Sequence, residues 1–187
     1  MKLIKLRKAE IADRFGLART LINATNSAFN GRVPKHCLTS LGVTESANNW
    51  RRSLEQDMQD RHLFVAEVES ADLVGFILAG ARPGKHTEPT GESQSIAAYS
   101  AEVISIQIEP AWQRNGLGCM LVQHVAGVLV NEGHRNLLVR VLVDNPNVTF
   151  YEKLGAGLLG SRDYDWEGYQ TRELIYGWQD LLELVPT

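Results

Sequence analysis

The chain has 187 residues, a length that argues for one domain over residues 1–187 and leaves little room for a second compact core. Hydrophobic residues make up 44% and charged residues 22%, which is typical of a soluble globular protein and excludes a largely disordered chain. The net charge is −3 and there is no basic run, so binding to nucleic acid is not expected.

Neither a membrane span nor a secretory leader is expected. The longest apolar stretches, such as Leu137 to Val143, are far shorter than the roughly 20 residues that cross a bilayer. The amino terminus alternates charged and apolar residues, whereas a signal peptide needs a continuous apolar core. Two cysteines make no disulfide framework. We therefore expect a cytoplasmic protein that does not bind membranes.

The amino-terminal part of the chain predicts a strand followed by two helices. Residues 2–7 alternate in polarity, which favours a short strand. Apolar residues then recur at spacings of three and four over residues 11–29, and again over residues 44–58. Between these helices, residues 31–42 contain Pro34 and are expected to form a loop.

Residues 62–109 predict a hairpin, a loop and a long strand. Two apolar runs over residues 62–68 and 73–81 are separated by four polar or small residues, a pattern typical of a β-hairpin. Residues 82–95 hold two prolines and two glycines, so we expect a mobile loop there. A long strand is expected over residues 98–109, stopped by Pro110.

The remaining residues predict a helix over 117–132, a strand over 137–143, a short helix over 146–154, and strands over 158–164 and 169–178. The strand over 137–143 is almost wholly apolar, so both of its faces should be covered. The fold class is therefore α/β with a mixed sheet, in which the two strands linked by the long helix run parallel.

Residues 103–120 carry the most informative motif, a strand followed by a glycine-containing loop and a helix. The first amides of a helix have no partner within the helix, so a phosphate can bind them. Gly116 and Gly118 lack the side chains that would keep a pyrophosphate away from that backbone. A P-loop would need Gly-Lys-Ser/Thr, and a dinucleotide fingerprint would need a third glycine at Leu121, so both are excluded.

The pattern Gln113-x-x-Gly116-x-Gly118 resembles the signature of the GNAT superfamily of acyl-coenzyme A dependent N-acetyltransferases. A second recurring stretch of that family, an Asn followed by Phe-Tyr-Glu-Lys-Leu-Gly, is similar to residues 145–155. The resemblance covers roughly residues 3–178. It implies a splayed mixed sheet of about seven strands with helices on both faces.

The resemblance also implies acetyl-CoA as co-substrate. No metal is expected, because the sequence scatters His36, His62, His86 and His134 without the spacing of a metal site. The pantetheine arm would pair with the backbone of residues 106–108, and the pyrophosphate would meet the amides of residues 114–119. The expected cofactor contacts are Ile106, Gln107, Ile108, Gln113, Arg114, Asn115, Gly116, Leu117, Gly118, Cys119 and Asn145.

Glu102 is the first candidate catalytic residue, because it lies eleven positions before Gln113 and matches the spacing of the general base in protein-acetylating members of the family. An amine with a pKa near 10.4 is mostly protonated at pH 7, so a group that accepts its proton is needed. The alternative is a glutamate at a strand end that lies in solvent or pairs with an arginine.

Tyr151 is the second candidate, since the resemblance implies that it returns a proton to the departing thiolate. The alternative is an aromatic residue packed beside Phe150 and Leu154. Asn145 is also expected to be the N-cap of the short helix, with Pro146 at its first position.

We therefore expect an N-acetyltransferase that moves an acetyl group from acetyl-CoA to a primary amine of a small molecule or peptide by direct attack in a ternary complex. A CoA-binding sensor or scaffold without turnover is the alternative, and a longer acyl donor stays open. Acids and aromatics over residues 163–167 suit either a cationic acceptor or a solvated hairpin turn. A homodimer is possible for this family.

Overall fold

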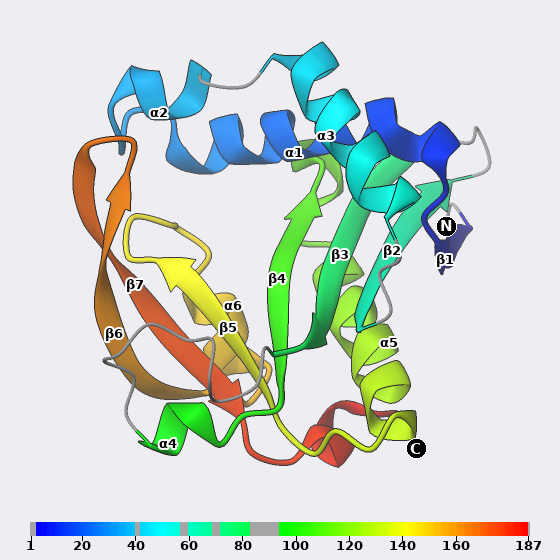
Figure 1. The fold of residues 1–187 in the computed structure, drawn as a ribbon, viewed down its shortest axis with the longest axis vertical. Coiled ribbons are helices and arrows are strands. Elements are labelled where there is room, and N and C mark those ends of the chain that lie inside the picture. Colours follow the sequence, from blue (N-terminus) through cyan, green and yellow to red (C-terminus); the bar gives the residue numbers. More distant parts are fainter. Residues whose placement is uncertain (1–2, 40–41, 57–59, 69–71, 83–93, 187) are drawn as a thin grey trace.

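The computed structural model describes residues 3–39, 42–56, 60–68, 72–82 and 94–186. Their centre is a seven-stranded sheet in the order β1-β2-β3-β4-β5-β7-β6 (Figure 1). The strands are β1 Ile4–Lys8, β2 Arg61–Val68, β3 Leu73–Ala81, β4 Ala101–Ile108, β5 Leu137–Leu142, β6 Gly157–Trp166 and β7 Tyr169–Trp178. The helices are α1 Arg14–Phe29, α2 Lys35–Thr39, α3 Val43–Glu55, α4 Gln94–Ala97, α5 Leu117–Asn131 and α6 Thr149–Lys153.

The sheet opens between its two central strands. Strands β4 and β5 are the parallel pair, joined by α5 as predicted, and the other neighbours in the sheet are antiparallel. Their pairing covers only Ala101–Val103 against Leu137–Val139. Beyond it β4 and β5 diverge (Figure 1), so among the described residues the segment 105–108 of β4 pairs with β3 alone. The predicted mixed and splayed sheet is confirmed.

A β-bulge lies at the point where the two strands separate. Ser105 pairs with Leu78 and Val103 pairs with Ala79, so Ile104 has no partner on β3. The extra residue reverses the alternation of side chains along β4, because Val103 and Ile106 now face the same core. The side chain of Ile104 is 44% exposed.

Helices cover both faces of the sheet, because its central strands are apolar on both sides. Helix α5 packs on one face through a core that includes Leu121, Val125 and Val139. Helices α1 and α3 cover the other face of β2 and β3, where Leu17 and Phe76 are buried. In the described part of the chain no helix has the length and apolar character of a bilayer span.

Several predicted boundaries were wrong. The expected loop over residues 31–42 contains α2, and the strand expected from residue 98 begins at Ala101, after α4. The short helix covers only Thr149–Lys153, not residues 146–154. A short 3-10 helix over Leu181–Leu184 was not predicted. Most of the expected loop over residues 82–95 lies outside the described residues.

Candidate active site

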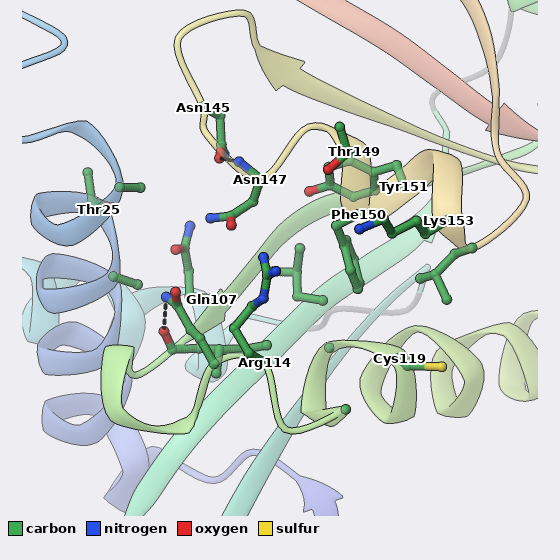
Figure 2. A pocket seen from close by; sticks show the side chains of 18 of the residues that line it. Thr25, Gln107, Arg114, Cys119, Asn145, Asn147, Thr149, Phe150, Tyr151 and Lys153 are labelled. Atoms are coloured by element: carbon green, nitrogen blue, oxygen red, sulfur yellow. Dashed lines mark hydrogen bonds between the residues drawn. The ribbon is translucent and has the colours of Figure 1, made fainter.

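A cavity of about 410 Å³ occupies the opening between β4 and β5 (Figure 2). Its walls come from α1, the end of β4, the loop before α5, and the segment from residue 145 through α6. Ten of the residues singled out in the sequence line it: Ile106, Gln107, Ile108, Gln113, Arg114, Gly116, Gly118, Cys119, Asn145 and Tyr151. The two sequence motifs therefore meet in one cavity.

The amino terminus of α5 presents free amides to this cavity. Gly116 is the N-cap, has a φ of 81° and makes no side-chain capping bond. A left-handed φ is costly for residues with a side chain, so glycine suits this position. The first turn of α5 contains no acidic residue that would repel or replace an anion. The helix start therefore fits the predicted phosphate site.

Gln113 and Asn115 hold the loop together. The Gln113 side-chain amide donates to the carbonyl oxygen of Ile108 at 3.0 Å, and that of Asn115 donates to the carbonyl of Gln113 at 3.1 Å. Asn115 and Leu117 do not line the cavity, and the side chain of Leu117 is buried in the core. Contacts of these two residues with a ligand would have to use the backbone.

Packing explains why a glycine stands at position 118, and the sequence alone did not reveal this. A Cβ added to Gly118 would lie 3.0 Å from the ring of Phe150 and 3.2 Å from Ile108, whereas a Cβ on Gly116 would meet nothing within 4 Å. The expectation that both glycines clear space for a pyrophosphate is thus incomplete. The missing side chain of Gly118 leaves room for the ring of Phe150, whereas Gly116 adopts the left-handed φ that the turn requires.

Two cationic side chains line the cavity. Arg114 comes from the loop before α5 and Lys153 from α6, and Figure 2 shows both beside the cavity. Within the described residues neither forms a hydrogen bond or an ion pair. Arg114 also has a φ of 65°, which costs a residue with a Cβ about 1 kcal/mol. Unpaired positive charge at this place favours an anionic ligand.

Tyr151 is both a packed aromatic and a cavity residue. Its side chain is 7% exposed and lies against Phe150, Tyr176 and Trp178, with ring centroids 5.1, 6.1 and 6.4 Å away. Its hydroxyl has no hydrogen-bond partner among the described residues and reaches into the cavity (Figure 2). Burial raises the pKa of Tyr151 to about 12. At neutral pH it is a proton donor.

Glu102 lies outside the lining of this cavity. Its neighbours Ala101 and Val103 face α5, so Glu102 lies on the opposite face of β4. Its carboxylate accepts from Arg140 and lies 3.7 Å from the guanidinium of Arg82, and all three side chains are largely buried. The pairing with arginine that the sequence left open is present, and the role of general base stays a prediction.

Asn145 was wrongly expected to cap the short helix. Its side-chain oxygen accepts from the amide of Asn147 at 2.9 Å, which closes a turn before α6, and the N-cap of α6 is Val148. Asn145 nevertheless lines the cavity. The turn therefore determines how the chain runs from β5 to the cavity-lining residues of α6.

The sequence missed nine residues that line the cavity. Four come from α1 and five from the segment around α6: Ala24, Thr25, Ala28, Phe29, Asn147, Thr149, Phe150, Lys153 and Leu154. Those around α6 lie within the second motif and were accessible to sequence reasoning. Those of α1 are brought close only by the tertiary fold, because α1 packs against β3 and β4.

The tip of the β6–β7 hairpin packs against α1 and α2. The rings of Phe29 and Trp166 are 5.3 Å apart in an edge-to-face contact, and the thiol of Cys37 donates to the carbonyl of Trp166. Asp163 on the same hairpin is 95% exposed.

In the described residues no group of three or more potential ligands could hold a metal ion.

Comparison with known proteins gives a family-level match. The FR47-like protein family model matches residues 92–165. The chain is 25% identical over 183 residues to YuaI of Bacillus subtilis (strain 168), which is named as an uncharacterized N-acetyltransferase. That match covers 97% of this chain and 96% of YuaI.

Solved acetyltransferase structures share the fold. The PaiA N-acetyltransferase of Thermoplasma acidophilum, in complex with coenzyme A, matches with a TM-score of 0.69 and 17% identity over 95% of this chain and 99% of that one. YncA of Salmonella typhimurium, a putative acetyltransferase with its cofactor acetyl-CoA, matches with a TM-score of 0.65 and 16% identity over 95% and 94%. The N-acetyltransferase of Staphylococcus aureus Mu50 matches with a TM-score of 0.66 and 18% identity over 96% and 99%.

Proposed function

The chain belongs to the GNAT superfamily of acyltransferases, and from this premise we propose that it transfers an acetyl group from acetyl-CoA to a primary amine by direct attack in a ternary complex. One observation carries the proposal. A single cavity is lined by the amino terminus of α5, by the edge of β4 that does not pair with β5 and by Tyr151. These are an anion site, a strand edge for an extended ligand and a proton donor in one space.

The phosphates of acetyl-CoA would bind at the start of α5. Amides that lack partners within the helix donate to the pyrophosphate, and the charges of Arg114 and Lys153 add to the attraction. The pantetheine arm would extend along Ile106–Ile108, where β4 has no neighbour on the side of β5. The thioester then lies in the opening of the sheet.

The reaction needs two proton transfers. The neutral amine attacks the thioester carbonyl carbon, the C–N bond forms, and the C–S bond of the tetrahedral intermediate breaks. Tyr151 donates its proton to the departing sulfur, which its neutral hydroxyl supports. The proton lost by the amine passes through water to Glu102, which lies on the opposite face of β4 from α5. Accepting it weakens the ion pairs of Glu102 with Arg140 and Arg82.

A screen of amine acceptors with acetyl-CoA, read by release of free thiol, tests this proposal. The expected result is thiol release that requires an amine and yields one N-acetyl product per thiol. Tyr151→Phe should lower kcat by about 10²-fold. Because the ring stays in place, the dissociation constant of acetyl-CoA should not change.

The same screen separates the enzyme from a CoA-binding sensor. A sensor binds acetyl-CoA but releases no thiol with any amine. Equal turnover of Tyr151→Phe and the parent would contradict the proposed role of the hydroxyl. Glu102→Gln should lower kcat and leave the dissociation constant of acetyl-CoA unchanged if Glu102 accepts the proton, and an unchanged kcat would contradict that role.

A further inference from the structure

The carboxylates near the opening, on the side of the sheet opposite α5, differ in their surroundings. Glu102 on β4 is paired with Arg140 and Arg82. Asp144 follows β5 and has no ion pair among the described residues. Asp144 lies in the turn after β5, on the side of Leu142, because its partner Tyr169 and Leu142 belong to the same apolar cluster. Asp144 has no arginine partner among the described residues, and neither has Glu109, which follows β4 and accepts hydrogen bonds from Asn23 of α1.

Two hydroxyl groups hold Asp144 in place. The hydroxyl of Thr171 donates to Oδ2 at 2.6 Å, and the hydroxyl of Tyr169 lies 3.4 Å from Oδ1. Burial and then the charge of Asp144 raise the pKa of Tyr169. Each carboxylate oxygen has a further lone pair for another donor. The Asp144 carboxylate is therefore held in place and can still accept a further hydrogen bond.

Asp144 lies beside the α1 end of the cavity. The next residue, Asn145, lines the cavity. Tyr169, its hydroxyl partner, belongs to the same apolar cluster as Phe29, which also lines the cavity.

One wall of the cavity is positively charged, and Asp144 lies outside the lining, next to the lining residue Asn145. Arg114 and Lys153 line the wall formed by α5 and α6, and no described carboxylate is part of the lining. An alkylamine with a pKa near 10.4 is a cation at neutral pH, and the positive wall repels it. Asp144 supplies a negative charge that attracts such an acceptor.

We propose that Asp144 binds the ammonium group of the acceptor, and that the enzyme therefore prefers alkylammonium acceptors to amines that are uncharged at neutral pH. The inference rests on the proposed acetyl transfer. In this arrangement Thr171 is a positioning residue, because its hydroxyl orients the carboxylate without touching the acceptor.

The test compares two acceptors on the full chain, butane-1,4-diamine as a cationic amine and 4-aminobenzamide as a neutral one, both read by thiol release from acetyl-CoA. Asp144→Asn should raise the KM for the diamine by about ten- to hundredfold, because a charge-assisted bond is lost. It should leave the KM for the neutral acceptor and the dissociation constant of acetyl-CoA unchanged. Thr171→Val should raise the KM for the diamine less, with kcat retained.

Asp163→Asn is the matched control, since it removes the same charge from a carboxylate that is 95% exposed. Its kinetics should equal those of the parent. If Asp144→Asn does not fold, the KM values of the parent are measured against salt concentration, and only the value for the diamine should rise.

An unchanged KM in Asp144→Asn, equal salt dependence of both acceptors, or acetylation of 4-aminobenzamide alone would overturn the inference while acetyl transfer stands. No binding of acetyl-CoA, or no thiol release with any amine, would overturn the proposed function as well.

Discussion

The two glycines of the phosphate loop meet different physical needs. Gly116 adopts a φ of 81° in open space, whereas Gly118 lies under the ring of Phe150. The sequence pattern placed both glycines correctly, but spacing alone did not reveal the contact with Phe150. That contact couples the start of α5 to α6, the two elements that carry the predicted motifs.

Gly118→Ala should therefore destabilise the protein. The added Cβ would force Phe150 to move, at a cost of about 1–3 kcal/mol. Gly127 is the matched control, because it lies in the same helix and a Cβ there meets nothing within 4 Å. Gly127→Ala should stabilise by about 1 kcal/mol through helix propensity. Urea unfolding checks both, and equal effects of the two substitutions would contradict the packing argument.

Arg114 combines an unfavourable backbone angle with a side chain that lines the cavity. Arg114→Gly should relieve strain and keep or raise the free energy of unfolding, by up to about 1 kcal/mol. The same change should weaken binding of acetyl-CoA by about five- to tenfold, because a cation near the phosphates is lost. Urea unfolding and calorimetric titration measure the two effects.

Glu167 provides the control for this variant. It has a φ of 52° in the β6–β7 turn and does not line the cavity. Glu167→Gly should change stability in the same direction and leave the affinity for acetyl-CoA as it was. A loss of affinity in Glu167→Gly equal to that in Arg114→Gly would assign the effect to the backbone instead of the charge.

At the scale of elements, Glu102 joins three strands at the base of the opening. It extends from β4, Arg140 from β5, and Arg82 follows β3 directly, with its side chain 4% exposed. This ion cluster lies where the pairing of β4 with β5 ends. The ion cluster therefore holds β4 and β5 together next to the point from which the two strands diverge.

Glu102→Gln should lower the free energy of unfolding by about 2–4 kcal/mol, since two buried guanidinium groups lose a counter-charge. Glu55→Gln is the control, because the pair of Arg51 and Glu55 is about half exposed and contributes only about 0.3–0.5 kcal/mol. Urea unfolding distinguishes them. A similar small loss in both variants would contradict a structural role of the cluster.

Long periodic elements were predictable, and short ones were not. The spacing of apolar residues gave α1, α5 and the apolar strand β5 because each buries a regular face over many residues. Helices α2 and α4 have five and four residues, too few for periodicity to be detected. The bulge at Ile104 was also missed, since it changes register without changing composition.

At the scale of the whole molecule, sequence motifs located one wall of the cavity and missed the other. The loop before α5 and the α6 segment are continuous patterns, so the motifs located both, although five lining residues around α6 were not singled out. The contribution of Thr25 and Phe29 arises because α1 crosses the open end of β4, a contact between residues about 80 positions apart in sequence. Asp144, whose hydroxyl partners lie on β7, was invisible for the same reason.

Calorimetric titration of the full chain with acetyl-CoA measures whether this cavity binds the co-substrate. We expect saturable binding to one site, with a dissociation constant between about 1 μM and 1 mM, as is usual for enzyme substrates. Addition of salt should weaken this binding, because the phosphates meet the cations that line the cavity. The absence of any detectable heat of binding at millimolar acetyl-CoA would contradict the proposed binding of the co-substrate.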